Sequence, residues 1–130
     1  MIFPGITAFY AAILGLIYVA LPGLVVFGRG KFKVFNGDGG NQTMHQMIRA
    51  HANFNEYVPL LLVLIGFLEA GGGSPSIVRI MLIVLVVARA LHPFGMLARE
   101  KSVRQMICRG FSSLATWIIL IVVSILLLTR

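Results

Sequence analysis

The segment that decides the fold is Arg49-Ala50-His51-Ala52-Asn53-Phe54-Asn55-Glu56-Tyr57-Val58-Pro59, which runs directly into Leu60-Leu61-Leu62-Val63-Leu64-Ile65. Its first part carries several polar side chains, whereas its second part is continuously apolar. At about 100° per residue, a helix places Asn53 roughly 40° from Arg49 and Glu56 roughly 20° to the other side. The three polar groups therefore share one helical stripe. Because an ionisable side chain at the bilayer centre costs about 2.5–3.5 kcal/mol on insertion scales, we expect the stripe to serve a ligand or a neighbouring helix.

The composition indicates an integral membrane protein. The chain has 130 residues, of which 58% are hydrophobic and 12% charged, and its mean hydropathy is +0.95. A soluble globular domain carries roughly a quarter charged residues, so this chain is short of the side chains that a water-exposed surface needs. The length suits a single domain over residues 1–130.

Four hydrophobic windows approach the roughly 20 residues that a bilayer-spanning helix requires. They predict helices at about residues 2–27, 43–70, 76–98 and 105–129. The second window reaches that length only if its polar first turns are included, and Asn41 or Thr43 is a suitable N-cap for it. The sequence therefore predicts an all-α integral membrane protein, a bundle of four transmembrane helices.

The net charge of +7 is concentrated in two segments between the predicted helices. The basic residues of these segments are Arg29, Lys31 and Lys33 after the first helix, and Arg99, Lys101, Arg104 and Arg109 around the third connection. By the positive-inside rule, both segments are predicted to face the cytoplasm and both chain ends the other side. No basic surface interleaved with aromatic residues is available, so we expect no nucleic-acid partner.

Two of the connections between the predicted helices are informative about structure. Residues 28–43 form the longest connection, and connections of this length are often functional. The second connection, residues 71–76, is rich in glycine and predicts a tight hairpin. Glu69 and Arg79 flank this hairpin and are expected to pair or to extend toward the membrane interface.

The predicted third helix carries a second polar row, formed by Arg89, His92, Met96 and Arg99 at spacings of three, four and three. Arg89 lies about two turns inside the membrane and needs a partner, for which Glu56 is the candidate by charge and depth. The pair either joins the second and third helices or helps to hold a ligand, and the two roles are compatible.

The polar side chains match an anionic ligand better than a metal. The three histidines lack metal-ligand spacing, so we expect no metal site. Arg29, Arg49 and Arg104 can form bidentate bonds to carboxylates. Since Glu56 can accept from an ammonium group and Asn53 can donate and accept, a zwitterion with two carboxylates and one amine fits the set.

The second predicted helix is polar on two sides, because His51 and Asn55 fall roughly opposite the Arg49 stripe. A helix of this kind cannot face lipid alone, so it needs two protein neighbours or a ligand pocket. A four-helix chain of this size has few places to bury two polar faces. This pattern favours an oligomer.

These residues resemble the MAPEG superfamily, the membrane-associated proteins in eicosanoid and glutathione metabolism. The resemblance covers the four helices, the long first cytoplasmic connection and the pattern Arg49-Ala50-x-x-Asn53-x-x-Glu56-Tyr57-x-Pro59. A second pattern, Arg89-x-x-His92-x-x-Gly95-Met96, is more similar to bacterial members than to the mammalian synthases. The resemblance implies a homotrimer in the bacterial inner membrane, which binds glutathione as a co-substrate between subunits near the cytoplasmic face.

The resemblance also implies roles for individual residues. It places glutathione contacts at Arg29, Arg49, Asn53, Glu56, Tyr57, Arg89 and His92. Arg104 is nearest in register to the family's thiol-activating arginine if one residue is inserted, and Arg99 and Arg109 are the alternatives. Two positions depart from the family pattern: Met96 replaces a tyrosine of the leukotriene synthase, and His45 stands where several members have glutamate. The resemblance therefore supports glutathione binding more directly than catalysis.

Three functions are consistent with the sequence. The first is a glutathione transferase or peroxidase that acts on a small apolar electrophile entering from the bilayer, with Arg104 stabilising the thiolate. The second is a non-catalytic trimeric membrane binding protein of the same family. The third is a small proton-coupled exporter, which would need a carboxylate central to its transport path. Glu56 lies toward one end of its helix beside Arg49, which disfavours the third.

Overall fold

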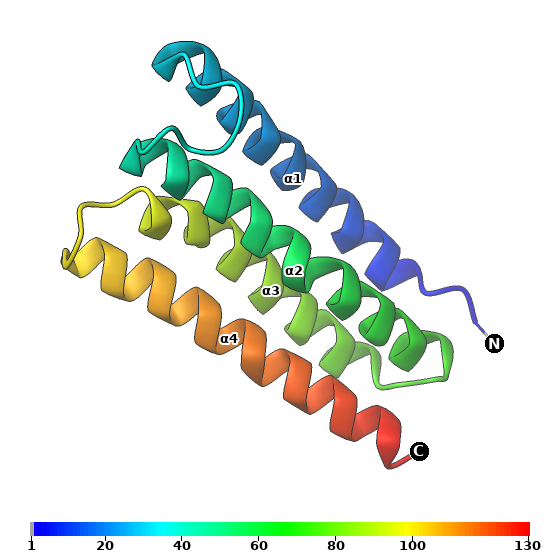
Figure 1. The fold of residues 1–130 in the computed structure, drawn as a ribbon. Helices are drawn as coiled ribbons and strands as arrows, with labels where there is room; N and C mark the ends of the chain where they lie inside the picture. The colour runs from blue at the N-terminus through cyan, green and yellow to red at the C-terminus, as the bar shows by residue number, and fades with distance from the viewer. Residues whose placement is uncertain (1) are drawn as a thin grey trace.

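The protein is a bundle of four long helices in the computed structural model, which describes residues 2–130. The helices are α1 (Gly5–Phe32), α2 (Gln42–Ala70), α3 (Pro75–Met96) and α4 (Val103–Leu128), and they lie side by side (Figure 1). The connections at residues 33–41 and 97–102 lie at one end, whereas the α2–α3 hairpin and both chain ends lie at the other. Each helix is long enough and apolar enough to cross a membrane, which confirms the predicted all-α fold.

Apolar side chains occupy both the interior and the outer surface of the bundle. Leu14, Leu61 and Leu82 are at most 1% exposed and belong to one core cluster that all four helices share. On the outside, large apolar side chains of every helix are exposed, such as Leu16 at 77% and Ile121 at 58%. A water-soluble monomer seldom exposes this much contiguous apolar surface. The outer surface therefore suits the hydrocarbon of a bilayer.

The first helix extends further than the sequence predicted. It ends at Phe32 rather than near residue 27, so Arg29 and Lys31 belong to α1 and the connection shrinks from 28–43 to 33–41. The helix ends where Lys33 adopts a left-handed conformation with φ of 55° and its N–H bonds to the Arg29 carbonyl. The hydrophobic window stops with the apolar side chains, whereas the backbone hydrogen bonds of the helix continue.

The other helix boundaries follow from local caps. Asn41, one of the two residues predicted to cap α2, accepts a hydrogen bond of 2.9 Å from the Met44 N–H. Ser102 caps α4 by accepting from the Gln105 N–H, so α4 begins at Val103, slightly before the predicted position. Pro75 begins α3 at a position where a missing N–H costs nothing.

The hairpin end of the bundle is held by polar contacts of Glu69, and these do not include the pairing with Arg79 that was one of the two alternatives expected. The Glu69 carboxylate accepts from the backbone N–H groups of Ile6 and Thr7, each at 2.8 Å, and from the Thr7 hydroxyl at 2.7 Å. The first turn of a helix has unpaired N–H groups and a partial positive charge. Glu69 at the end of α2 therefore caps α1 instead of neutralising Arg79.

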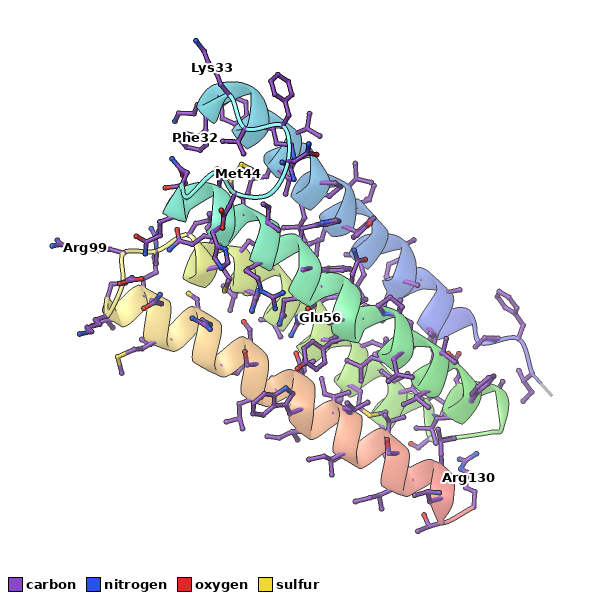
Figure 2. All side chains as sticks on the ribbon, in the orientation of Figure 1. Phe32, Lys33, Met44, Glu56, Arg99 and Arg130 are labelled. Carbon is purple, nitrogen blue, oxygen red and sulfur yellow. The ribbon has the colours of Figure 1, made fainter. Side chains whose placement is uncertain are left out.

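Both ends of the chain bind to this hairpin region. The Ile2 N–H donates to the Ala70 carbonyl at 3.1 Å, and the Arg130 guanidinium donates to the Gly71 carbonyl at 2.6 Å. Figure 2 shows Arg130 at this end of the bundle, and Lys33 and Arg99 at the opposite end. The basic connections and the chain ends therefore lie at opposite poles, although their orientation in a membrane stays a prediction.

Candidate functional site

A polar pocket lies between α2, α3 and α4, in the half of the bundle nearer the two basic connections. It is a cavity of about 260 Å³ lined by Arg49, Asn53, Tyr57, Arg89, His92, Met96, Arg109, Ser113, Thr116 and Trp117. Five predicted site residues therefore converge there from two helices. The other three predicted residues, Arg29, Glu56 and Arg104, are not in its lining.

Arg89 is the most buried member of the pocket, at 1% exposure. Its guanidinium donates to the Asn53 side-chain oxygen at 2.8 Å, to the Ser112 carbonyl at 3.3 Å and to the Thr116 hydroxyl. It also lies 5.9 Å from the centre of the Tyr57 ring. All of these partners are neutral. The Nε of Arg89 has no hydrogen-bond partner within residues 2–130.

The predicted Glu56–Arg89 pair is wrong. Glu56 instead forms an ion pair with Arg49 on its own helix, with a shortest N–O distance of 3.2 Å. Both side chains are nearly half exposed, at 44% for Arg49 and 46% for Glu56. Asn53 lies on the side of α2 that faces α3 and takes the place at Arg89 that was predicted for Glu56, whereas Glu56 is exposed.

The Arg89 guanidinium is held from α4 by a feature that the sequence analysis missed. Thr116 donates its hydroxyl to the Ser112 carbonyl at 2.7 Å, one turn earlier on α4. The same hydroxyl and the same carbonyl accept from Arg89. This arrangement fixes the direction of the guanidinium. The available signal was the pair Ser112 and Thr116, which lie one turn apart beside apolar residues of the helix.

Tyr57 has a hydrogen-bond partner on α4 that was also missed. The indole Nε1 of Trp117 donates to the Tyr57 hydroxyl at 3.2 Å. Both residues line the polar pocket. Because the tyrosine oxygen accepts this bond, its own O–H remains available to donate to a ligand.

The Arg29 side chain is hydrogen-bonded to the first connection, residues 33–41. One terminal nitrogen of its guanidinium, Nη1, donates to three carbonyls, those of Val34 at 3.3 Å, Phe35 at 3.0 Å and Gly37 at 3.1 Å. These bonds hold residues 34–37 against the end of α1. Arg29 would have to release them before it could contact a ligand in the polar pocket.

Asp38 and His45 fasten the same connection to α2. A carboxylate oxygen of Asp38 lies 2.8 Å from the His45 Nδ1, and the other accepts from the Gly40 N–H at 2.9 Å. The Gly40 N–H and then the His45 side chain hold the pKa of Asp38 below its ordinary value of 3.8. The connection is therefore fixed at two points, Arg29 and His45.

The two arginines of α4 lie differently. Arg104 lies in the first turn and is exposed, outside the lining of the polar pocket. Arg109 lies in the pocket lining. Of the arginines considered for thiol activation, Arg109 is thus the one that shares a cavity with Arg49, Arg89 and His92.

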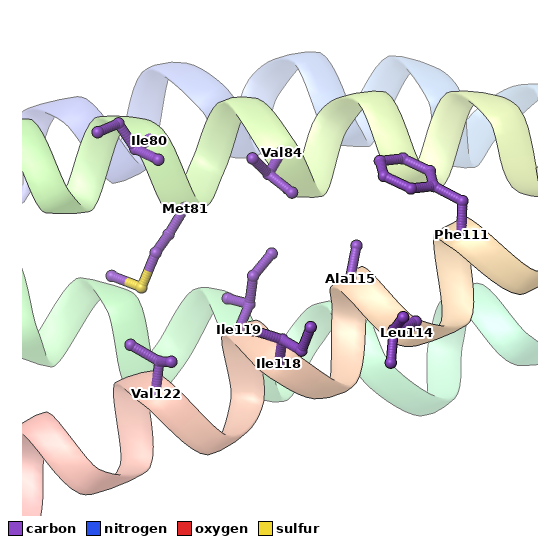
Figure 3. A pocket seen from close by; sticks show the side chains of 9 residues that line it. All are labelled: Ile80, Met81, Val84, Phe111, Leu114, Ala115, Ile118, Ile119 and Val122. Carbon is purple, nitrogen blue, oxygen red and sulfur yellow. The ribbon is translucent and has the colours of Figure 1, made fainter.

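A second hollow lies between α3 and α4 (Figure 3). This apolar groove has a volume of about 360 Å³ and is lined entirely by apolar residues, namely Ile80, Met81, Val84, Phe111, Leu114, Ala115, Ile118, Ile119 and Val122. It has no polar group that could orient a reacting molecule. It suits contact with apolar chains.

The opposite side of α2 carries a smaller polar cluster. The His51 Nε2 lies 3.3 Å from the Tyr18 hydroxyl of α1 and 3.4 Å from the Asn55 side-chain nitrogen. Asn55 is exposed. The structure therefore confirms that α2 has polar groups on two sides, one toward α3 and α4 and the other toward α1.

The fold and the polar pocket define a class of protein: a four-helix membrane protein with a cationic pocket between its helices. The sequence matches the profile of the MAPEG family over residues 7–129, and the chain belongs to that family. It is similar to "Inner membrane protein YecN" of Escherichia coli strain K12 and of E. coli O6:H1, at 36% identity over 90 residues in each case. The aligned region covers 69% of this chain and 69% of each relative. No solved structure was found to match the chain.

Proposed function

We propose that the protein binds glutathione in the polar pocket. It then either transfers glutathione to an apolar electrophile that enters from the bilayer, or uses glutathione to reduce that electrophile. The observation that carries this proposal is the convergence of Arg49, Arg89 and Arg109 on one cavity whose lining contains no carboxylate. Such a cavity attracts an anion. The cavity of about 260 Å³ is comparable in size to a small peptide, and the resemblance described above suggests glutathione as that peptide.

In this proposal, the carboxylates of glutathione bind to guanidinium groups, and Asn53 and the Tyr57 hydroxyl orient the peptide. Glu56 receives the ammonium group, for which it would exchange part of its contact with Arg49. In a transferase reaction the sulfur forms a bond to an electrophilic carbon, the leaving group departs, and the thiol proton goes to solvent. Arg104 is the proposed thiolate-stabilising residue.

A homotrimer forms part of the proposal. The Arg49–Glu56 pair and Asn55 are exposed on a helix that is apolar enough to cross a membrane. Polar groups facing lipid are costly, so a neighbouring subunit is the expected cover. A neighbour could also bring Arg29 or Arg104, which lie outside the pocket of their own subunit, to an adjacent pocket.

We place the protein in the bacterial inner membrane, where the name of its YecN relatives places them. The positive-inside rule then puts the connections at 33–41 and 97–102, and the nearby polar pocket, toward the cytoplasm. The hairpin and both chain ends would face the other side. This orientation would give the pocket access to a cytoplasmic thiol.

The first test is calorimetry with glutathione on the detergent-solubilised protein. Saturable binding is expected for the wild type, with a loss of at least about tenfold in affinity for Arg49→Ala, since a hydrogen-bonded charge contributes about 1.5–3 kcal/mol. Arg79→Ala, which removes an exposed arginine near the hairpin, is the matched control and should bind normally. Absence of binding to an intact oligomer would refute the proposal.

Turnover is tested separately. Arg104→Ala should lower the rate of conjugation and largely spare glutathione affinity, because Arg104 would act on the thiolate rather than on the peptide ends. An unchanged rate would remove Arg104 from the mechanism and direct attention to Arg109.

A non-catalytic binding protein is the second candidate, and one observation favours it. Met96 lines the polar pocket at the position where the leukotriene synthase has a tyrosine, so this wall lacks a hydroxyl donor. Saturable glutathione binding with no conjugation or peroxide reduction across chemically diverse electrophiles would support this candidate.

A further inference from the structure

The first connection, residues 33–41, exposes an aromatic side chain although its backbone is held in place. Phe35 is 87% exposed. Its carbonyl accepts from the Arg29 Nη1 at 3.0 Å, and the same nitrogen donates to the carbonyls of two nearby residues. The preceding Val34 is half-buried and packs under Gly39, where an added Cβ would lie 2.7 Å from the Val34 Cγ2. The exposure of Phe35 therefore belongs to a fixed conformation of the connection.

The connection turns back along the end of α1 (Figure 1). α1 has 28 residues, so at 1.5 Å per residue it is about 42 Å long, whereas the hydrocarbon core of a bilayer is about 30 Å thick. The first charged residue of α1 is Arg29, so the excess length lies at this end, among the lipid headgroups. Because the Phe35 carbonyl is bonded to Arg29, Phe35 lies near the depth at which α1 leaves the hydrocarbon.

Two exposed lysines precede Phe35 in the chain. Neither Lys31 nor Lys33 forms an ion pair within the described part of the chain. The Lys31 Nζ lies 5.5 Å from the centre of the Phe32 ring, and Figure 2 shows Lys33 at the same end of the bundle. Aromatic side chains are enriched at the membrane interface, and basic side chains there attract anionic lipids. This surface combines both.

The charge of the chain argues against a second copy as the partner of these lysines. The chain has four acidic residues, and in the structure over residues 2–130 each already has a partner. Their contacts are those of Asp38 with His45, Glu56 with Arg49, Glu69 with the start of α1, and Glu100 with Gln42. A neighbouring subunit would have to break one of these contacts to neutralise a lysine, whereas a lipid phosphate is already anionic.

We infer that the first connection docks on the membrane leaflet at the pole of the basic connections. Phe35 inserts between the lipids at the boundary of headgroups and acyl chains, and Lys31 and Lys33 bind the phosphates of anionic phospholipids. The inserted ring supplies the apolar part of the contact, and the lysines favour anionic over zwitterionic lipids. This inference goes beyond the proposed function, because it requires neither glutathione nor the polar pocket.

Tryptophan fluorescence in vesicles can locate the side chain at position 35. The chain has one tryptophan, so Trp117→Phe combined with Phe35→Trp leaves a single reporter, and Trp117→Phe alone is the blank. In vesicles that contain phosphatidylglycerol, brominated acyl chains should quench the reporter, and acrylamide in the water should not. In pure phosphatidylcholine, quenching by brominated lipid should fall to about half or less, since the lysines lose their anionic partners.

Charge variants assign the lipid preference to the two lysines. In the reporter protein, Lys31→Gln with Lys33→Gln should remove the difference between the two lipid compositions. Arg79→Gln with Lys101→Gln removes the same number of charges from other exposed positions and should leave that difference intact. Size-exclusion chromatography and thermal unfolding report whether each variant is folded.

Hydrogen–deuterium exchange provides a second measurement in a protein that keeps its native tryptophan. In the wild type, residues 34–41 should exchange more slowly in vesicles with phosphatidylglycerol than in those of phosphatidylcholine alone. Phe35→Ala should lose most of this difference, because no ring is left to insert. An equal difference in the wild type and in this variant would overturn the role of Phe35.

The quenching pattern distinguishes the possible surroundings of residue 35. A reporter that acrylamide quenches and brominated lipid does not would lie in water, which would overturn the inference. Protection from both quenchers would show that protein covers the position, such as a second copy of the chain, and would overturn it as well. Quenching by brominated lipid that is unchanged without phosphatidylglycerol, or unchanged in the double lysine variant, would overturn the binding of anionic lipid.

Discussion

Arg89 of α3 and Asn53 of α2 are joined by a hydrogen bond of 2.8 Å between a guanidinium nitrogen and the side-chain oxygen of the asparagine. This bond links two helices at the wall of the polar pocket. It also places a neutral group, rather than a carboxylate, against the most buried charge of the protein. Because Asn53 is neutral, it does not offset the positive charge of the pocket, and its hydrogen bond fixes the orientation of the Arg89 guanidinium.

Replacing Asn53 should destabilise the bundle as well as alter the pocket. Asn53→Ala leaves a buried guanidinium nitrogen without its acceptor, which should lower the free energy of unfolding by about 1–3 kcal/mol. Chemical unfolding in detergent measures the loss. Arg79→Ala, near the hairpin, is the control and should cost less, because the Arg79 side chain is exposed. Equal losses for the two variants would contradict the assignment.

Trp117 should affect ligand affinity through Tyr57. Trp117→Phe removes the indole donor to the Tyr57 hydroxyl and retains an aromatic ring. A single neutral hydrogen bond contributes about 0.5–1.5 kcal/mol, so glutathione affinity measured by calorimetry should fall about two- to tenfold. In Tyr57→Phe, which already lacks the hydroxyl, the Trp117 substitution should have no further effect. If the Trp117 substitution lowers glutathione affinity by the same factor with and without the Tyr57 hydroxyl, its effect does not act through that hydroxyl.

Gly95 should tolerate no side chain. Gly95→Ala places a methyl group 2.5 Å from a backbone atom of α4, and such overpacking costs about 1–3 kcal/mol. Thermal unfolding should therefore shift to lower temperature. Gly23→Ala is the matched control, since a Cβ there meets nothing within 4 Å and alanine is the better helix former. Comparable stability of the two variants would show that α3 and α4 are less closely packed than described.

The connection at residues 33–41 should loosen in acid. The pKa of Asp38 is lower in the folded protein than in the unfolded chain, so its contacts stabilise the connection above about pH 3.8. That stabilisation is lost as the pH falls through the folded pKa. Asp38→Asn should mimic the acid state at neutral pH. Hydrogen–deuterium exchange of residues 34–41 should increase in this variant relative to the wild type. No increase would contradict the role of Asp38.

The four helices were predictable because the length of an apolar run is a local property of the sequence. The end of α1 was not, because Arg29 and Lys31 continue the helix beyond its apolar part. A hydropathy window identifies the part of a helix that can lie in the bilayer. The end of the helix is instead set by the residues that cap its backbone. Asn41 was predicted as a cap because its short polar side chain can reach the free N–H groups of the first turn.

The α2 side of the pocket was predictable because Arg49, Asn53 and Tyr57 follow helical periodicity. On the α4 side, Arg109 was named only as an alternative to Arg104 and Trp117 was missed, since the facing of both depends on how closely α4 approaches α3 at Gly95. The wrong Glu56–Arg89 pairing has a similar origin. Depth along a helix can be estimated from the sequence, but rotation of one helix about its axis relative to another is set by packing.

The contacts of Ile2 with Ala70 and of Arg130 with Gly71 have a practical consequence. They hold both ends of the chain at the pole opposite the basic connections (Figure 1). A purification tag or surface anchor fused after Arg130 would therefore leave the pocket end of the bundle pointing away from the support. Immobilised in this way, the protein would present its cationic face to the surrounding solution, which is the geometry that ligand screening by surface-based biosensors requires.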